Sequence, residues 1–443
     1  MVANPIRLGE RGDAPVILEA DVVVVGGGSA GLAAAIASAQ TGARTALLER
    51  YGFFGGNATS AWVGTICGLY RKSSEGFDVV CRGFAERWAD GLKAAGAGFG
   101  PVPYKETAVL LYVPWAYKWQ ADRWVTSEEN LTPLLHATVT EVVRTGTSID
   151  AVVVGSKRGA LAVTGKVFVD ASGDADVAFH SGLTTQMGGP GQRQFPSMQF
   201  VMQNVDVQAA YAAGLERLNE LIANEGQSPE WDLSRSGGAV LPTFRPGEAL
   251  GAMTRIGVDG HAPDMTDPFE ATAAEIAGRV EAEKAGRFLK EHMPGFAEAF
   301  FADTPTQLGV RETRRGVGDY VLTGEDVLGA ARFGDAISCG AWPQEFHVEG
   351  KGTEWRWLDA GAFYQVPYRS LVAAGVDNLL LAGRCISATH EALASTRVIA
   401  PSMAQGEAAG VAGALAAQKG LTTRAVDVGE VQRILGERGA FLG

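Results

Sequence analysis

Cysteine is scarce in this chain of 443 residues. The four cysteines, Cys67, Cys81, Cys339 and Cys385, stand far apart, and no two of them form a C-x-x-C pair. This spacing argues against a zinc cluster and against the paired thiols of a disulfide reductase. We therefore expect no metal site, and a reducing cytoplasm as the default location.

Long apolar runs and runs of basic residues are missing as well. No stretch of about 18 uncharged apolar residues occurs, so we expect no membrane span. The N-terminal residues lack the apolar core of a signal peptide. The formal net charge is −12, from 38 basic and 50 acidic residues, which on average repels nucleic-acid phosphates. We expect a small-molecule substrate and no nucleic-acid partner.

The pattern of a nucleotide-binding turn begins at residue 22. Residues 22–25 are four consecutive valines, which is typical of a parallel strand buried on both faces. Gly26, Gly28 and Gly31 follow at the G-x-G-x-x-G spacing. This spacing supplies a tight turn, bare backbone beside a pyrophosphate, and close packing of helix on strand.

A helix and a second strand complete the unit. Residues 30–40 are rich in alanine and predict a helix whose positive N-terminus points at the phosphates. Residues 45–48 predict a strand that ends at Glu49, about 20 residues beyond the glycines, where an acid binds ribose hydroxyls. The unit as a whole predicts that the protein binds a dinucleotide.

The remaining sequence predicts a divided α/β fold. Strands are expected within residues 131–143, 151–163, 167–170 and 377–385, and helices over residues 84–95, 272–292 and 401–418. We predict a split Rossmann-like domain with a parallel central sheet, formed by residues 1–185 and 355–443. An α+β substrate domain, residues 186–354, is expected to be inserted between these two parts.

NAD and FAD both bind to a unit of this kind. A second fingerprint for NAD(P)H is missing, and a distant C-terminal strand and helix complete the site, as they do in flavin domains. Residues 22–49, 166–174 and 378–384 resemble the characteristic blocks of FAD-dependent oxidoreductases of the glutathione-reductase superfamily. The resemblance implies FAD as the cofactor.

Four further segments carry a narrower resemblance. Residues 55–59, 309–315, 320–326 and 384–392 are similar to the bacterial FAD-dependent oxidoreductase family, which is distantly related to fumarate reductase and succinate dehydrogenase flavoproteins. The unit and the resemblance together predict that FAD is bound by Gly26, Gly28, Ser29, Ala30, Gly31, Glu49, Arg50, Gly56, Asn57, Thr59, Val139, Ser172, Gly173, Asp174, Gly383, Arg384, Ser402 and Met403.

The sequence departs from its relatives at two points. Many members of the superfamily have an acid where Arg384 stands, so a carboxylate contact to the ribityl chain cannot be transferred by analogy. Succinate dehydrogenases bond FAD to a histidine in the loop after the second strand, whereas no histidine precedes His136 here. We therefore expect noncovalent FAD, with Cys67 as the nearby nucleophile that would prove this wrong.

The resemblance also suggests groups that take part in the reaction. It places residues 388–392, expected to form a loop, beside the isoalloxazine ring. His390 in this loop could take the substrate proton, or it could be a structural hydrogen-bonding residue. Arg397 is a further catalytic candidate, and His347 another. The N-terminus of the helix over residues 401–418 is expected to stabilise negative charge on the reduced flavin.

Three arginines form a cluster within an acidic chain. Arg311, Arg314 and Arg315 could clamp an anionic substrate, because guanidinium groups bind carboxylates in bidentate fashion. The alternative is a network of ion pairs with neighbours such as Glu312 and Asp319. We expect one or two of the three arginines to face a ligand, with Arg311 as the catalytic candidate.

These observations predict an FAD-dependent oxidoreductase. It is expected to transfer a hydride between a small, anionic organic substrate and flavin N5, and to exchange electrons with oxygen, a quinone or a protein partner. Reduction of an activated double bond fits the sequence equally well. An NAD-dependent dehydrogenase and a flavin-binding redox sensor without turnover are the alternatives. The sequence leaves substrate identity and a homo-oligomeric state open.

Overall fold

A computed structural model describes residues 5–7, 13–189, 192–347 and 352–443. Its largest sheet has seven strands in the order β10, β4, β3, β13, β12, β11, with β24 also pairing with β13. Their bounds are β10 Leu131–Leu134, β4 Thr45–Leu48, β3 Val16–Val25, β13 Gly159–Asp170, β12 Ser148–Ser156, β11 Thr138–Thr145 and β24 Leu379–Leu381. Strands β10, β4, β3, β13 and β24 pair in parallel with one another, whereas β12 pairs antiparallel with both β13 and β11.

The valines of β3 face two separate cores, as expected for a strand buried on both faces. Val22 and Val24 pack with helices α1 (Ser29–Gln40) and α10 (Ile399–Lys419). Val23 and Val25 pack on the opposite face with residues of β11, β12 and α5 (Asp176–His180). The sheet is therefore sandwiched between two layers, which places the carboxyl end of β3 inside the protein.

Helices α1 and α10 approach each other closely through glycine. A Cβ atom at Gly406 would lie 2.0 Å from the carbonyl oxygen of Ala30, and one at Gly410 would lie 2.1 Å from that of Ala34. The backbones are thus in direct contact, which larger residues would prevent. This contact fixes where the N-terminus of α1 points.

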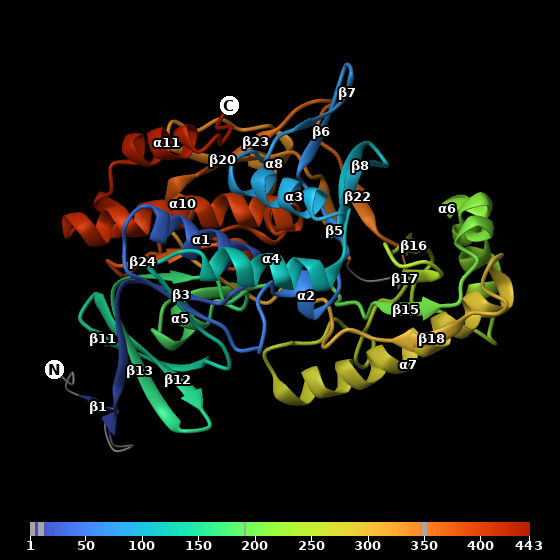
Figure 1. Ribbon diagram of the computed structural model, residues 1–443, viewed down its shortest axis with the longest axis horizontal. Helices are drawn as coiled ribbons and strands as arrows, with labels where there is room; N and C mark the ends of the chain where they lie inside the picture. Colours follow the sequence, from blue (N-terminus) through green and yellow to red (C-terminus); the bar gives the residue numbers. More distant parts are fainter. Residues whose placement is uncertain (1–4, 8–12, 190–191, 348–351) are drawn as a thin grey trace.

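A second sheet is formed by the middle of the chain. Its antiparallel strands lie in the order β16 (Ala239–Pro242), β17 (Glu248–Ala252), β15 (Phe200–Gln203) and β18 (Phe300–Asp303). Together with helices α6 (Val207–Asn224) and α7 (Pro268–His292), this sheet surrounds its own apolar core, which includes Phe200 and Phe288. Figure 1 shows this part at the right, with the seven-stranded sheet at the left.

Smaller sheets and helices complete the fold. The three-stranded sheet contains β5 Thr65–Ile66, β9 Thr107–Tyr112 and β8 Gly98–Tyr104, and the two-stranded pairs are β1 Ile6–Arg7 with β2 Asp13–Ala14, β6 Tyr70–Ser73 with β7 Gly76–Val79, β14 Thr185–Met187 with β19 Arg314–Gly316, β20 Ala336–Gly340 with β23 Tyr364–Pro367, and β21 Gln344–Phe346 with β22 Glu354–Arg356. The remaining α-helices are α2 Asn57–Ser60, α3 Phe84–Ala94, α4 Pro114–Thr126, α8 Gly324–Leu328, α9 His390–Thr396 and α11 Val428–Glu437.

The predicted fold class is confirmed, because a parallel central sheet is accompanied by an additional sheet with its own helices. The expected loop at His390 is wrong: this residue begins helix α9, which Thr389 caps by accepting a hydrogen bond from the N–H of Ala392. The domain boundaries at residues 185/186 and 354/355 stay a prediction. Among the described helices, none is both long and apolar enough to cross a membrane.

Candidate cofactor and substrate site

The glycine turn after β3 has the geometry that the spacing predicts. Gly26 has a φ of +95°, and a Cβ there would lie 2.4 Å from the carbonyl oxygen of Ala171. A Cβ at Gly31 would lie 1.7 Å from the carbonyl oxygen of Gly26, so Gly31 permits the helix to sit on the turn. At Gly28 the nearest atom would be 3.7 Å away, which leaves its backbone open. Helix α1 begins there without a side-chain cap, so its first N–H groups are suited to bind an anion.

Glu49 ends strand β4 beside this turn. Its Oε2 accepts a hydrogen bond of 2.7 Å from the N–H of Gly27, and its Oε1 accepts one of 2.9 Å from the N–H of Tyr51. Burial raises the pKa of Glu49, although these two hydrogen bonds oppose the shift. Each carboxylate oxygen has a second lone pair, which is available to a ribose hydroxyl.

A cavity of about 150 Å³ lies over the turn. Of the residues predicted to bind FAD, it is lined by Gly26, Gly28, Ser29, Ala30, Glu49, Arg50, Gly56, Asn57, Ser172, Gly173, Gly383, Arg384 and Ser402. These residues come from the β3–α1 turn, the ends of β4, β13 and β24, and the starts of α2 and α10. The structure therefore brings together segments that lie more than 300 residues apart in the sequence.

The other predicted contacts lie behind the lining. Thr59 donates its hydroxyl hydrogen to the carbonyl oxygen of Phe54, and Val139 is buried in β11. Gly31 packs against the turn, Met403 is buried within α10, and Asp174 lies in an ion-pair cluster. Other residues line this cavity but were not predicted, because they belong to no sequence motif. They include Tyr51, Ala137, Thr138, Gln307, Ala382 and Ile399.

Asp174 forms ion pairs with two arginines at the edge of this cavity. Its carboxylate is 3.1 Å from Nη2 of Arg384 and 3.3 Å from Nη1 of Arg50, and it accepts a 2.7 Å hydrogen bond from Thr313. Burial alone would raise the pKa of Asp174, but Arg384 and Arg50 outweigh it and lower the pKa. Gly173 has a φ of +85°, a conformation that favours glycine, and its lack of a side chain leaves room for Arg384 Nη2.

A second cavity, of about 910 Å³, adjoins the first. Asn57, Arg384, Arg397 and Ile399 line both cavities and so mark the junction. The larger cavity extends from this junction between the β5–β9–β8 sheet, the β16–β17 hairpin and helix α6. Its position makes it the space into which the reacting end of a bound dinucleotide and a substrate would reach.

Besides Arg384, which pairs with Asp174, three guanidinium groups line the larger cavity. Arg311 donates to the carbonyl oxygen of Phe195 at 2.7 Å and to Oγ of Ser197 at 3.0 Å. Arg397 donates to Gln194 Oε1 at 2.9 Å and to the carbonyl oxygen of residue 345 at 3.2 Å, and its Nε has no partner in the described part of the chain.

Arg235 is the third of these groups. It donates to Oγ1 of Thr353 at 3.2 Å and to the carbonyl oxygen of Ala252 at 3.5 Å. Burial lowers the pKa values of Arg235, Arg311 and Arg397, and for Arg311 the other two arginines add to this effect. Within the described ranges, none of the three has a carboxylate oxygen within 4.0 Å.

An acid and a histidine share the cavity with these arginines. Nε2 of His347 is 3.0 Å from Oε1 of Glu345. Burial alone would raise the pKa of Glu345, but His347, Arg397 and Arg311 together lower it to about 2. Burial and the charge of Arg311 hold the pKa of His347 well below its ordinary value. At neutral pH, Glu345 is therefore ionised and His347 is neutral.

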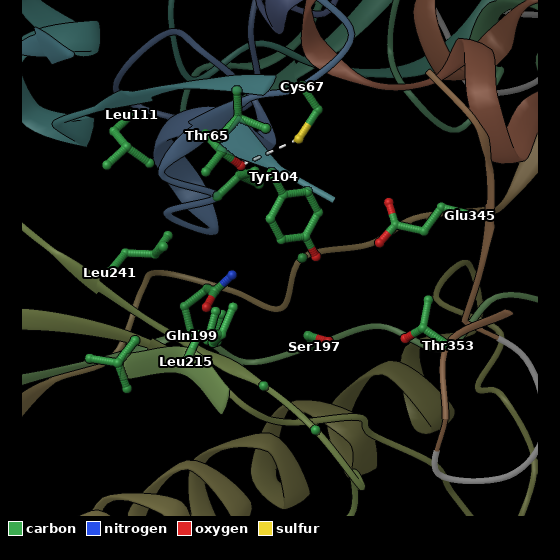
Figure 2. A pocket seen from close by; sticks show the side chains of 18 of the residues that line it. Thr65, Cys67, Tyr104, Leu111, Ser197, Gln199, Leu215, Leu241, Glu345 and Thr353 are labelled. Carbon is green, nitrogen blue, oxygen red and sulfur yellow. Dashed lines mark hydrogen bonds between the residues drawn. The ribbon is translucent and has the colours of Figure 1, made fainter. Parts of the chain in front are cut away.

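Tyr104 lies along the wall of the cavity. Its ring is parallel to that of Trp342, with centroids 6.4 Å apart, and meets Trp355 edge-on at 6.1 Å. Figure 2 shows Tyr104 between a group of leucines and Glu345. Burial, with a smaller contribution from Glu345, raises the pKa of Tyr104, so its hydroxyl keeps its proton at neutral pH. Sequence reasoning missed Arg235, Tyr104 and Glu345, because none of them belongs to a local motif.

His390 lines neither cavity. Its Nδ1 is 2.8 and 3.0 Å from the two carboxylate oxygens of Glu312, which also accepts a 2.6 Å hydrogen bond from Arg315. Arg314 pairs with Asp176 at 2.8 Å. Arg311 is therefore the member of the arginine cluster that reaches the larger cavity, while Arg315 forms the predicted alternative, an ion pair with Glu312. The catalytic role of His390 stays a prediction.

Comparison with known proteins agrees with the geometry of the first cavity. The sequence profile of the family described as FAD dependent oxidoreductase matches residues 21–435. A search of curated protein sequences finds no match.

Two solved structures illustrate the structural neighbours. One is a geranylgeranyl bacteriochlorophyll reductase-like protein from Thermoplasma acidophilum, with 14% identity, 95% of this chain and 84% of that chain covered, and a TM-score of 0.46. The other is p-nitrophenol 4-monooxygenase PnpA from Pseudomonas putida, with 12% identity, coverage of 95% and 87%, and a TM-score of 0.45.

The residues present fit FAD. The uncapped start of α1 and the open backbone at Gly28 suit a pyrophosphate, and Glu49 suits a ribose. Because the family profile matches residues 21–435, nearly the whole chain, this chain belongs to the FAD-dependent oxidoreductase family and uses FAD as its cofactor.

Proposed function

We propose that this oxidoreductase transfers a hydride between FAD and a small organic anion, and that half-buried arginines bind the anionic group. The observation that carries the proposal is the set of Arg235, Arg311 and Arg397, which line one cavity without a carboxylate within ion-pair distance in the described part of the chain. These half-buried guanidinium groups donate to neutral oxygens, and a charge that has lost part of its water favours a ligand of opposite charge.

A carboxylate is the anion that best matches this arrangement. Guanidinium groups bind it through two parallel hydrogen bonds, which also orient the neighbouring carbon atoms. Glu345 is ionised and offsets one of the three positive charges, so a net positive charge is left for the substrate. A neutral substrate would leave that charge unpaired.

Arg384 and Arg397 support a reaction at the junction of the two cavities. Both residues line the smaller cavity over the glycine turn as well as the larger cavity. FAD, when bound, supplies the acceptor or donor of a hydride. A substrate carboxylate held by Arg311 and Arg235 would be positioned on the far side of this junction.

Tyr104 is the group to which we assign the proton that accompanies hydride transfer. It lines the larger cavity, and burial keeps its hydroxyl protonated. A protonated hydroxyl can donate to a carbanion or an oxygen atom that develops on the substrate. This assignment favours reduction of an activated double bond or carbonyl, with oxidation as the reverse reaction.

The proposal is tested with purified holoenzyme under anaerobic conditions. A panel of small carboxylic acids is mixed with the oxidised enzyme, and a parallel panel of unsaturated acids with the photoreduced enzyme, while flavin absorbance is followed. We expect an acid to change the redox state, and the matching primary amide to be at least about tenfold less effective.

Two variants sharpen this test. Arg311→Gln should weaken binding of the active acid by about 10- to 150-fold, which corresponds to losing one charged hydrogen bond. Arg424→Gln removes a solvent-exposed pair with Asp319 and serves as the control, with unchanged binding. Equal response to acids and amides would contradict the proposal. Reoxidation of the reduced enzyme by oxygen, a soluble quinone or an electron-carrier protein then identifies the class of electron partner.

A further inference from the structure

We infer that the substrate is an amphiphile, a carboxylate that carries an extended apolar tail. This inference rests on the proposed function, because it takes the arginines as the site of the carboxylate. It adds that the remainder of the cavity selects an apolar chain or ring system rather than a short, polar acid.

The two ends of the larger cavity differ in chemistry. Figure 2 shows Leu111, Leu215 and Leu241 toward one side, and Glu345 and Thr353 toward the other. The leucines come from β9, α6 and β16, elements that lie far apart in the sequence. Their convergence produces an apolar end opposite the charged end, and that is the pattern of a ligand with one charged group and one apolar body.

Apolar side chains at this end are left exposed to solvent. Leu215 is 47% exposed, Tyr211 73% and Phe99 63%, and all three line the cavity. Scattered exposed apolar residues are common, whereas a group gathered on one concave surface indicates a binding site. An apolar tail that covers them would remove this surface from water.

An aromatic wall joins the two ends. Tyr104, Trp342 and Trp355 contact one another and line the cavity, and Figure 2 shows Tyr104 between the leucines and Glu345. Their flat faces can pack against methylene groups or a ring. The apolar path is therefore continuous from the anion-binding end.

Helix α6 contributes to the apolar end from both sides of a break. Gly214 has φ +79° and ψ 169° within the helix, and Tyr211 and Leu215 flank it. A Cβ at Gly214 would have no atom within 4 Å, so glycine is required by its conformation and not by a lack of space. Tyr211 and Leu215, on either side of the break, both line the cavity.

The volume agrees with a large ligand. The cavity of about 910 Å³ lies at the upper end of the range of about 300–1,000 Å³ that is common for sites of drug-sized molecules. A two-carbon acid would fill a small part of it and leave the leucines uncovered.

The test measures binding to the holoenzyme across a homologous series. Saturated straight-chain acids of increasing length and their primary amides are titrated anaerobically, with the perturbation of flavin absorbance and calorimetry as readouts. We expect the affinity of the acids to rise by about fourfold per methylene over several carbons, which is the transfer value for buried methylene groups. Each amide should bind at least about tenfold more weakly than its acid.

Matched variants locate the effect. Leu215→Asn should weaken binding of a long-chain acid by at least about fivefold while leaving a two-carbon acid unchanged. The control, Ile276→Asn, changes an apolar residue of α7 that is similarly exposed, at 54%, but lines neither cavity, and it should alter neither affinity.

The outcomes separate the two proposals. A preference for acids without dependence on chain length overturns the amphiphile and leaves the proposed function standing. Dependence on chain length without a preference for acids overturns the binding of a carboxylate by the arginines. If Leu215→Asn and Ile276→Asn have the same effect, the apolar end at α6 does not bind the tail.

Discussion

The contact between α1 and α10 leads to a quantitative prediction for FAD binding. In Gly406→Ala, the new Cβ would lie 2.0 Å from the carbonyl oxygen of Ala30, whereas nonbonded Cβ contacts in proteins are essentially never below 3.0 Å. The helices must therefore separate by at least about 1 Å at this point. Ala30 lines the smaller cavity over the glycine turn, so a shift of Ala30 also moves the N–H groups at the start of α1.

Two free-energy terms oppose each other in this variant. Replacing glycine by alanine within a helix contributes about 1 kcal/mol of stability, whereas overpacking of a tight contact costs about 1–3 kcal/mol. The same helix provides a control in Gly413→Ala, because a Cβ there would meet Val22 at an ordinary 3.5 Å. We expect Gly413→Ala to raise the free energy of unfolding by up to about 1 kcal/mol, and Gly406→Ala to lower it.

Cofactor affinity should respond more strongly than stability. Loss of one charged hydrogen bond between an α1 N–H group and the pyrophosphate costs about 1.5–3 kcal/mol, which raises the dissociation constant of FAD by about 10- to 150-fold. The assay is titration of the apoprotein with FAD, followed by flavin fluorescence, alongside urea unfolding of the same samples. The reasoning is refuted if Gly406→Ala binds FAD within about threefold of the parent chain, or if Gly413→Ala weakens FAD binding equally.

Three further outcomes follow from single side chains. Burial and two neighbouring carboxylates raise the pKa of Asp176 from 3.8 to about 6. The folded state thus holds this proton more tightly than the unfolded chain, and the stability that it contributes is lost as the pH rises from about 4 to 6. Urea midpoints across this range should fall less steeply in Asp176→Asn, and an unchanged slope would contradict the assignment. Burial raises the pKa of Cys67 to about 12, so the thiol stays protonated and is a poor nucleophile. Acid denaturation should therefore release all flavin into the supernatant. Flavin in the protein pellet would disprove noncovalent binding. Tyr104→Phe should slow the change in flavin redox state at saturating substrate by about 100-fold or more. His390→Gln removes the contact between the imidazole and Glu312, and it should lower stability with less effect on that rate. If His390→Gln slows the reaction more than Tyr104→Phe does, the proton-transfer role returns to His390.

Local chemistry made some parts of this protein predictable. Four valines followed by three spaced glycines allow few conformations, because bulky β-branched residues favour a strand and glycine alone permits the turn at Gly26. The predicted strand at residues 45–48 and helix at residues 84–95 agree with β4 and with α3 to within one residue. The conformation of such segments depends on residues within about one helical turn or one strand in the sequence.

His390 shows where local reasoning failed. Residues 388–392 are predicted to form a loop, although Thr389 is suited to cap a helix that begins at His390. Whether the histidine then faces a cavity or an ion-pair network depends on Glu312, which lies 78 residues earlier. No spacing rule connects two such positions.

Short-range sequence alone specifies the part of the cofactor site around the glycine turn. The turn with Gly26 and Gly28, helix α1 and Glu49 are contiguous, so backbone preferences and hydrogen bonds over short distances specify them. The substrate half was decided by tertiary structure. Arg235, Tyr104 and the leucines of the apolar end meet because two sheets from different parts of the chain face each other across one cavity. The loss of water around groups that are ordinary when exposed is the physical reason for proposing Arg235 and Tyr104 as substrate-binding and proton-donating groups.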